Sequence, residues 1–123
     1  QTLDRARDGD RQNYGLREQR ALLLALEDKK GEASREMDSG LETYAAIQIY
    51  GPASAAGFYA VMGDVDRALE WLDRAVRMGD DREEYFRRNP LLKDLRTHPR
   101  FQQILGAVTY RRQQRAVRYG ARG

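Results

Sequence analysis

The sequence predicts an all-α fold made of antiparallel helical hairpins with a C-terminal capping helix. Apolar side chains recur at intervals of three and four residues from Val65 to Val76, which is the spacing of an amphipathic helix. The apolar stretch before it ends at Gly63, which breaks a helix, and Asp64 follows as a candidate N-cap. A content of 41% hydrophobic and 33% charged residues fits a helix-rich globular domain.

The N-terminal third of the chain predicts a polar segment followed by a helix. Residues 1–15 are polar and contain the breaker Asn13-Tyr14-Gly15, so we expect an arm or a frayed helix there. Residues 16–29 have a strongly helical composition, and their leucines point in several directions around the helix axis. This helix is therefore expected to be covered on two sides and to end at Gly31.

The middle of the chain predicts two further helical segments. Residues 32–48 carry apolar side chains at helical intervals and are expected to form one helix, completing a degenerate first hairpin. Tyr50-Gly51-Pro52 then separates the two hairpins, with Pro52 at a favourable helix start. The second hairpin runs to Met78 and is ended by Gly79.

The C-terminal third predicts a short helical turn, a proline break and a last helix. Pro90 closes the turn over residues 80–89 because it disfavours helical geometry at Asn89. Pro99 opens the last helix, whose first half carries apolar residues at helical spacing. We thus divide the chain into an arm (1–15), a helical domain (16–108) and a basic tail (109–123), whose glycines suggest that it frays.

The second hairpin resembles a tetratricopeptide repeat, a family of stacked helical hairpins. That family expects small and large apolar residues in a fixed order around a Gly-Asp or Gly-Asn turn. The matching residues are Ala56, Tyr59, Gly63, Asp64, Ala68, Leu72 and Ala75. Two features depart from the family pattern: Leu72 stands where an aromatic residue is common, and the consensus Trp and Pro are missing, with Trp71 one place off.

The segment that follows adds a second resemblance. Residues 85–105, YFRRNPLLKDLRTHPRFQQIL, look like the segment that closes helical-repeat regions in large bacterial signalling proteins, including serine/threonine kinases, nucleotide cyclases and winged-helix regulators. The signature residues are Pro90, Leu91, Leu95, Arg96, Pro99, Arg100 and Phe101. His98 departs from the pattern, which usually has Asp or Ser there. The resemblance implies a non-enzymatic protein–protein interaction module, the accessory region of such a protein.

The basic C-terminal tail suggests another class of partner. The formal net charge is only +3, yet no acidic residue follows Asp94. Arg111, Arg115, Arg118 and Arg122 fall on one side of any continuing helix, and the candidate partner contacts in this segment are Arg111, Arg112, Arg115 and Arg118. They can form a solvated helix end, contact phosphates of nucleic acid or of a membrane surface, or clamp an acidic protein. Tyr110 and Tyr119 could stack on bases, so a small nucleic-acid-associated protein is the alternative function.

The sequence offers little for catalysis. There is no cysteine and one histidine, His98, which excludes a thiolate nucleophile and the usual zinc ligand sets. Acidic pairs such as Asp64/Asp66 are predicted on turns and surfaces, without a desolvated cleft to separate their pKa values. No phosphate-binding glycine motif is present. We therefore expect no enzyme activity, no cofactor and no metal.

Trp71 is the remaining candidate for a partner contact. It lies beside the apolar stripe of its helix, which predicts a half-buried side chain that packs on the next element or meets a ligand. A protein or peptide partner and self-association are both expected. The longest apolar run, 21–26, is too short to cross a membrane. Because the chain starts at Gln1, processing or truncation is expected, and the compartment, cytoplasmic or exported, stays open.

Overall fold

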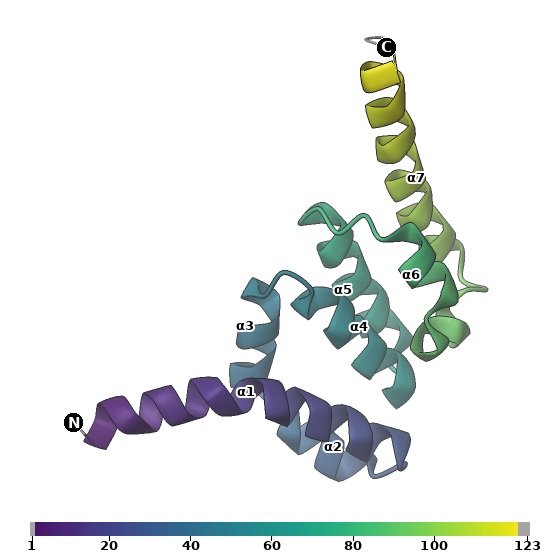
Figure 1. The fold of residues 1–123 in the computed structure, drawn as a ribbon. Coiled ribbons are helices and arrows are strands. Elements are labelled where there is room, and N and C mark those ends of the chain that lie inside the picture. Colours follow the sequence, from purple (N-terminus) through teal and green to yellow (C-terminus); the bar gives the residue numbers. More distant parts are fainter. Residues whose placement is uncertain (1, 121–123) are drawn as a thin grey trace.

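A computed structural model describes the backbone of residues 2–120 and the side chains of residues 13–118. Every regular element in this range is a helix, which confirms the predicted all-α class. The elements are α1 (Thr2–Leu26), α2 (Lys30–Glu36), α3 (Ser39–Ile47), α4 (Gly51–Met62), α5 (Val65–Arg77), α6 (Glu83–Arg88), the 3-10 helix η1 (Pro90–Leu95) and α7 (Pro99–Gly120). Figure 1 shows the α4–α5 pair in the middle, with α1–α3 on one side and α6, η1 and α7 on the other.

Helix α4 is the centre of the packing. Nearly every residue from Gly51 to Ala60 is buried, and most of them are alanine or glycine. Small side chains let neighbouring backbones approach closely, and α4 packs against α1, α3, α5 and η1. Phe58 and Tyr59 supply the bulk, with their rings 5.0 Å apart in an edge-on arrangement.

The α4–α5 hairpin forms at the predicted turn. Gly63 adopts φ +83° and donates to the carbonyl of Ala60, while the N–H of Asp64 bonds to Tyr59, the arrangement that satisfies the last carbonyls of a helix. The carboxylate of Asp64 then accepts from the N–H of Arg67 at 3.2 Å and caps α5. The apolar residues of the repeat pattern are buried in this hairpin: Ala56, Tyr59, Ala68, Leu72 and Ala75.

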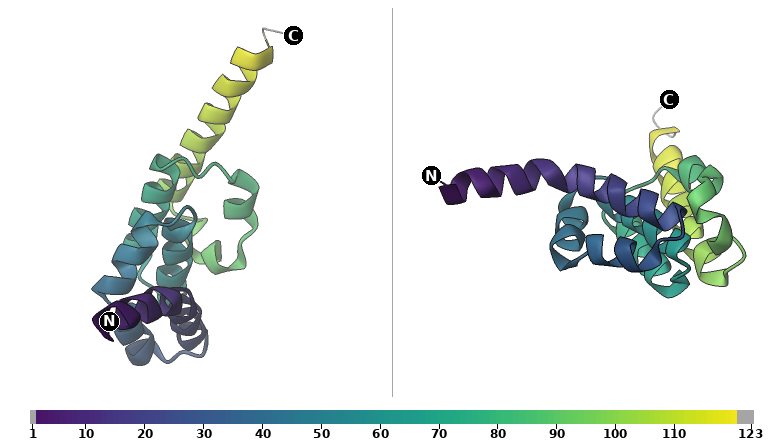
Figure 2. Two further views of the ribbon diagram at one scale, coloured as in Figure 1. Left: turned by 60° about the vertical axis from the view of Figure 1, so that its left-hand side comes forward. Right: turned by 90° about the horizontal axis from the view of Figure 1, so that it is seen from below.

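The expected interruption at residues 13–15 is absent, because α1 continues through them. Two contacts hold this part of the helix on the body. The ring of Tyr14 lies 4.9 Å from that of Tyr44, and Arg17 donates to the side chains of Glu36 and Asp38 at 3.0 and 2.8 Å. The predicted polar arm is therefore continuous with the first helix, and Figure 2 shows its N-terminal part extending beyond the body.

Helix α1 ends earlier than expected, and not at a glycine. Asp28 adopts φ +62° and donates to the carbonyl of Ala25, while Lys29 donates to Leu24. This is the same closing geometry that Gly63 makes after α4, here made by an aspartate. Gly31, the predicted stop, lies inside α2 instead.

We expect Asp28→Gly to raise the free energy of unfolding by about 0.5–1 kcal/mol, because glycine adopts a positive φ without a Cβ clash. Chemical denaturation monitored by circular dichroism measures the change. Asp28→Ala is the matched control: it also removes the carboxylate but keeps the Cβ, so it should not stabilise the protein. Equal stabilisation by both variants would assign the effect to charge and contradict the conformational argument.

The predicted single helix over residues 32–48 is wrong, since the chain breaks between α2 and α3 at Met37 and Asp38. The carboxylate of Asp38 accepts from the N–H of Leu41 at 2.9 Å and starts a new helix. Arg17 fixes the break by donating to Asp38 and to the backbone carbonyl of Glu36. This capping and the Arg17 ion pair both lower the pKa of Asp38.

The C-terminal elements follow the prolines as predicted. Asn89 is extended ahead of Pro90, η1 follows, and Pro99 begins α7. The buried side chains that join these elements to the core are Phe86, Leu92, Leu95, Phe101, Leu105 and Val108. Helix α7 continues to Gly120 and its second half projects from the body (Figures 1 and 2), whereas Gly123 lies outside the described residues.

Helix α1 is covered on one side, not on two as predicted. Ala21 and Ala25 are buried against the body. The opposite face leaves Leu16, Leu23 and Leu26 with 60%, 56% and 56% of their surface exposed. Within the described range, no helix combines the length and apolar character needed to cross a membrane.

Candidate functional site

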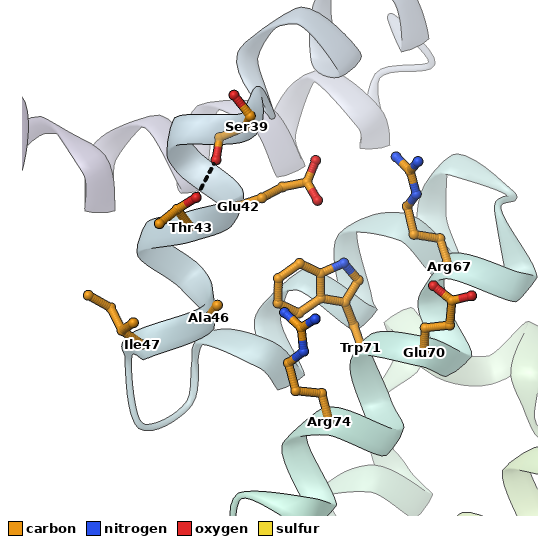
Figure 3. Close-up of a pocket in the computed structure, with 9 residues that line it drawn as sticks. All are labelled: Ser39, Glu42, Thr43, Ala46, Ile47, Arg67, Glu70, Trp71 and Arg74. Carbon is orange, nitrogen blue, oxygen red and sulfur yellow. Dashed lines mark hydrogen bonds between the residues drawn. The ribbon is translucent and has the colours of Figure 1, made fainter.

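A groove with a volume of about 530 Å³ lies between α3 and α5, which both pack on α4. We call it the Trp71 groove. Figure 3 shows side chains from both helices pointing into it. Its lining residues are Ser39, Glu42, Thr43, Ala46, Ile47, Arg67, Glu70, Trp71 and Arg74.

Trp71 occupies the centre of this groove. Only 6% of its surface is exposed, so it is more deeply buried than the half-buried side chain we expected. The guanidinium carbon of Arg74 lies 4.6 Å from its ring centre, within the range of a cation–π contact. Its indole nitrogen faces the side of the groove where Glu42 and Arg67 lie (Figure 3). No side chain of the described part accepts a hydrogen bond from this N–H.

The groove carries both signs of charge around the indole. Glu42 and Glu70 provide carboxylates, and Arg67 and Arg74 provide guanidinium groups. Arg67 also lies 5.2 Å from the ring centre of Tyr59. Burial raises the pKa of the Tyr59 hydroxyl, and the charge of Glu42 adds to the rise. Tyr59 therefore stays a neutral phenol near neutral pH, which suits packing and hydrogen bonding, not general-base chemistry.

The groove continues into an exposed apolar patch at the end of α3. Ile47 also lines a second depression of about 290 Å³, where the α3–α4 turn meets the end of α5. The large apolar side chains there are strongly exposed: Ile47 (72%), Ile49 (79%), Tyr50 (54%) and Met78 (53%). We call these four residues the Ile49 patch. An indole-centred groove beside an apolar patch is a surface suited to binding another chain.

The structure brings two of the predicted tail arginines back onto the body. Arg115 pairs with Asp81 at 2.9 Å, and Arg112 lies 3.4 Å from Glu83. The hydroxyl of Thr109 also donates to Glu83, which is the main cause that lowers the pKa of this carboxyl. Arg111 and Arg118 make no ion pair with an acidic side chain of the described range. Part of the positive charge of the basic segment is thus paired with carboxylates of the same chain.

The residues considered for catalysis lie at the starts of helices or on the exposed surface. The carbonyl of His98 accepts from the N–H groups of Phe101 and Gln102 at the start of α7. Asp64 caps α5, and Asp66 is exposed beside it. No group of three metal-ligating side chains occurs among the residues described.

No family model matches the sequence, and neither a curated protein nor a solved structure matches the chain. The resemblance to tetratricopeptide repeats and to the closing segment of bacterial signalling proteins therefore stays a prediction. Inferences about the function of the chain therefore rest on the geometry of its surface.

Sequence reasoning selected Trp71 but missed the opposite wall of its groove. The missed residues on α3 include Glu42, Thr43 and Ile47. The sequence predicts a single helix over residues 32–48 and singles out none of these three as a candidate site residue. The signal that could have placed them was Asp38, followed by small residues at 39 and 40, which is a typical helix start.

Proposed function

We propose that this chain is a non-enzymatic protein–protein interaction module that binds a segment of another protein in the Trp71 groove. The observation that carries the proposal is an open groove centred on an indole whose N–H finds no acceptor among the described side chains. Tryptophan and arginine are enriched among residues that dominate binding energy at interfaces. Here Trp71 and Arg74 are stacked on each other at the centre of the groove.

The chemistry of the groove defines what such a segment must offer. An acceptor, such as a backbone carbonyl, would pair with the indole N–H. An apolar side chain would cover the Ile49 patch, where Ile49 itself is 79% exposed. Carboxylates and guanidinium groups line the same groove, so a segment with mixed charges is better matched than a strongly acidic or basic one.

The wider role follows from the resemblance and is part of the proposal. The α4–α5 hairpin has the repeat-pattern residues at its turn and in its core, which supports a tetratricopeptide-like scaffold. By that resemblance, the chain would serve as the accessory region of a bacterial signalling or regulatory protein. Its task would then be to hold a partner rather than to transform a substrate.

The test uses Trp71, the single tryptophan of the chain, as its own reporter. Peptides selected from a random displayed library for binding to the whole chain should change tryptophan emission when they bind. Thr43→Arg fills the groove from its α3 wall and should weaken these peptides on the order of tenfold or more. Gln103→Arg adds the same charge at an exposed position on α7, and should leave their affinity unchanged.

Two outcomes would contradict the proposed site. Peptides that bind without altering tryptophan emission would occupy another surface. Peptides that bind Thr43→Arg as tightly as the unaltered chain would show that the groove is not used. Selection of no binding peptide at all would remove the support for a peptide-binding module.

Nucleic-acid binding through α7 is the second candidate, favoured by the projecting helix with Arg111 and Arg118 on it (Figure 1). The pairs of Arg112 with Glu83 and of Arg115 with Asp81 weigh against it, because these arginines would have to leave acidic partners to meet phosphates. Such binding would fall steeply with added salt. Peptide binding in the Trp71 groove would depend on salt much less.

A further inference from the structure

A second pocket, on another side of α4, contains a carboxylate oxygen that accepts no hydrogen bond from the described residues. This pocket lies between α1 and α4 and has a volume of about 300 Å³. None of its lining residues lines the Trp71 groove. The residues around it are Gly15, Glu18, Gln19, Leu22, Met37, Ser54, Ala55 and Phe58.

Among the described residues that line this pocket, Glu18 is the only ionisable one. Its Oε1 atom is buried and has no hydrogen-bond partner among the described residues. The guanidinium of the neighbouring residue Arg17 does not donate to this oxygen, because it donates to Glu36 and Asp38 on another side of α1. A buried charged oxygen without a donor is costly, and burial accordingly raises the pKa of Glu18.

The wall around this carboxylate combines the apolar Leu22, Met37 and Phe58 with the polar Gln19 and Ser54, and an exposed apolar strip lies further along α1. Glu18, Leu22 and Leu26 lie four residues apart and form one ridge along α1. Leu23 is the neighbour of this ridge, and both Leu23 and Leu26 are 56% exposed. Phe58 and Met37 face the ridge from the other side of the pocket. A carboxylate in a pocket that is also lined by Leu22, Met37 and Phe58 matches a side chain with an apolar stem and a cationic end.

We propose that the pocket between α1 and α4 binds the arginine or lysine side chain of a partner segment, with its cationic end on the Glu18 carboxylate. Arginine fits best, since its planar guanidinium can donate to both carboxylate oxygens while its stem lies against Leu22 and Phe58. Apolar residues beside that arginine would cover Leu23 and Leu26. The proposal explains why α1 keeps a second apolar face that the chain itself leaves exposed, and it does not depend on the Trp71 groove.

The experiment compares two capped tripeptides on the full chain, followed by amide chemical shifts in NMR titrations. One is Leu-Arg-Leu, and the other is Leu-citrulline-Leu, in which a neutral urea replaces the guanidinium with the same shape. The arginine peptide should bind on the order of 1 mM, with shifts confined to residues 15–26, to residue 37 and to residues 54–58. The citrulline peptide should bind at least about fivefold more weakly, because the charge pair is missing.

Glu18→Gln is the matched variant of the protein. It removes the charge of a partly buried carboxylate whose Oε1 has no partner among the described residues, so its melting temperature should equal or exceed that of the unaltered chain, and lost binding would not reflect unfolding. In this variant the preference for arginine over citrulline should vanish. Equal binding of both peptides to the unaltered chain, or an arginine preference that persists in Glu18→Gln, would overturn the proposal. Concentration-dependent shifts of residues 15–22 without peptide would overturn it in favour of a second copy of the chain.

Discussion

Gly51→Ala is expected to lower the free energy of unfolding by about 3 kcal/mol or more. A Cβ atom at this position would lie 1.8 Å from the carbonyl oxygen of Ala45, 2.7 Å from its carbonyl carbon and 3.0 Å from its Cα. All of these are backbone atoms, so no side-chain rotation can relieve the clash. The end of α3 must move away from the start of α4 to make room. Urea or guanidinium denaturation measures the loss.

Gly106→Ala is the matched control for that substitution. Gly106 lies within α7, and nothing comes within 4 Å of a Cβ built there. Alanine should therefore stabilise the helix by about 0.5–1 kcal/mol through its higher helix propensity. If both variants changed stability alike, helix propensity alone would explain the results, and the close approach of α3 and α4 would be contradicted.

The clash at Gly51 also has a consequence for function. Helix α3 forms one wall of the Trp71 groove, and its contact with α4 fixes the distance of that wall from α5. A shift of Ala45 away from Gly51 would carry Ala46 and Ile47 with it. Peptides that bind the groove should therefore lose affinity for Gly51→Ala even under conditions where the variant is folded.

The elements that the sequence predicts correctly are those fixed by local chemistry. Gly63 reverses the chain through a backbone conformation that glycine adopts easily, and Asp64 caps the next helix within three residues. Pro52, Pro90 and Pro99 begin helical elements because proline at these positions sacrifices no hydrogen bond. Each of these features can be understood within one turn of the chain, so no partner distant in sequence is needed.

The features that the sequence did not predict depend on contacts between distant residues. The break between α2 and α3 is held by Arg17, which lies nineteen residues before Glu36 and twenty-one before Asp38. The end of α1 is an exception because it is local: Asp28 adopts a conformation that non-glycine residues seldom adopt. Because the break was missed, α3 was not recognised as a separate helix, and half of the Trp71 groove was missed with it.

The second large effect is expected at Arg82, which ties together the ends of several helices. Its guanidinium donates to both carboxylate oxygens of Asp80 at 2.8 Å, and the Asp80 side chain is only 2% exposed. The same guanidinium lies 4.0 Å from the ring centre of Tyr50 and 4.1 Å from that of Tyr85. It therefore joins the α3–α4 turn, the end of α5 and the start of α6.

Arg82→Met should lower the free energy of unfolding by about 3 kcal/mol, because it leaves the buried carboxylate of Asp80 without its partner. Asp80→Asn combined with Arg82→Met removes the stranded charge and should recover part of this loss, with a coupling of about 1–3 kcal/mol between the two sites. Denaturation of the single and double variants measures that coupling. Additive losses would show that the ion pair itself contributes little.

Comparison with another ion pair of the chain distinguishes the effect of the distance between the charged groups from the effect of their burial. Arg77 approaches Asp73 at the same 2.8 Å, but 78% of the arginine side chain is exposed. Arg77→Met should therefore change stability by no more than about 0.5 kcal/mol, since solvent screens the exposed pair. The two ion pairs have the same separation. A large loss of unfolding free energy for Arg82→Met and a small one for Arg77→Met would therefore show that burial of the carboxylate and stacking between Tyr50 and Tyr85 determine the stabilisation. Equal losses at the two sites would contradict this explanation.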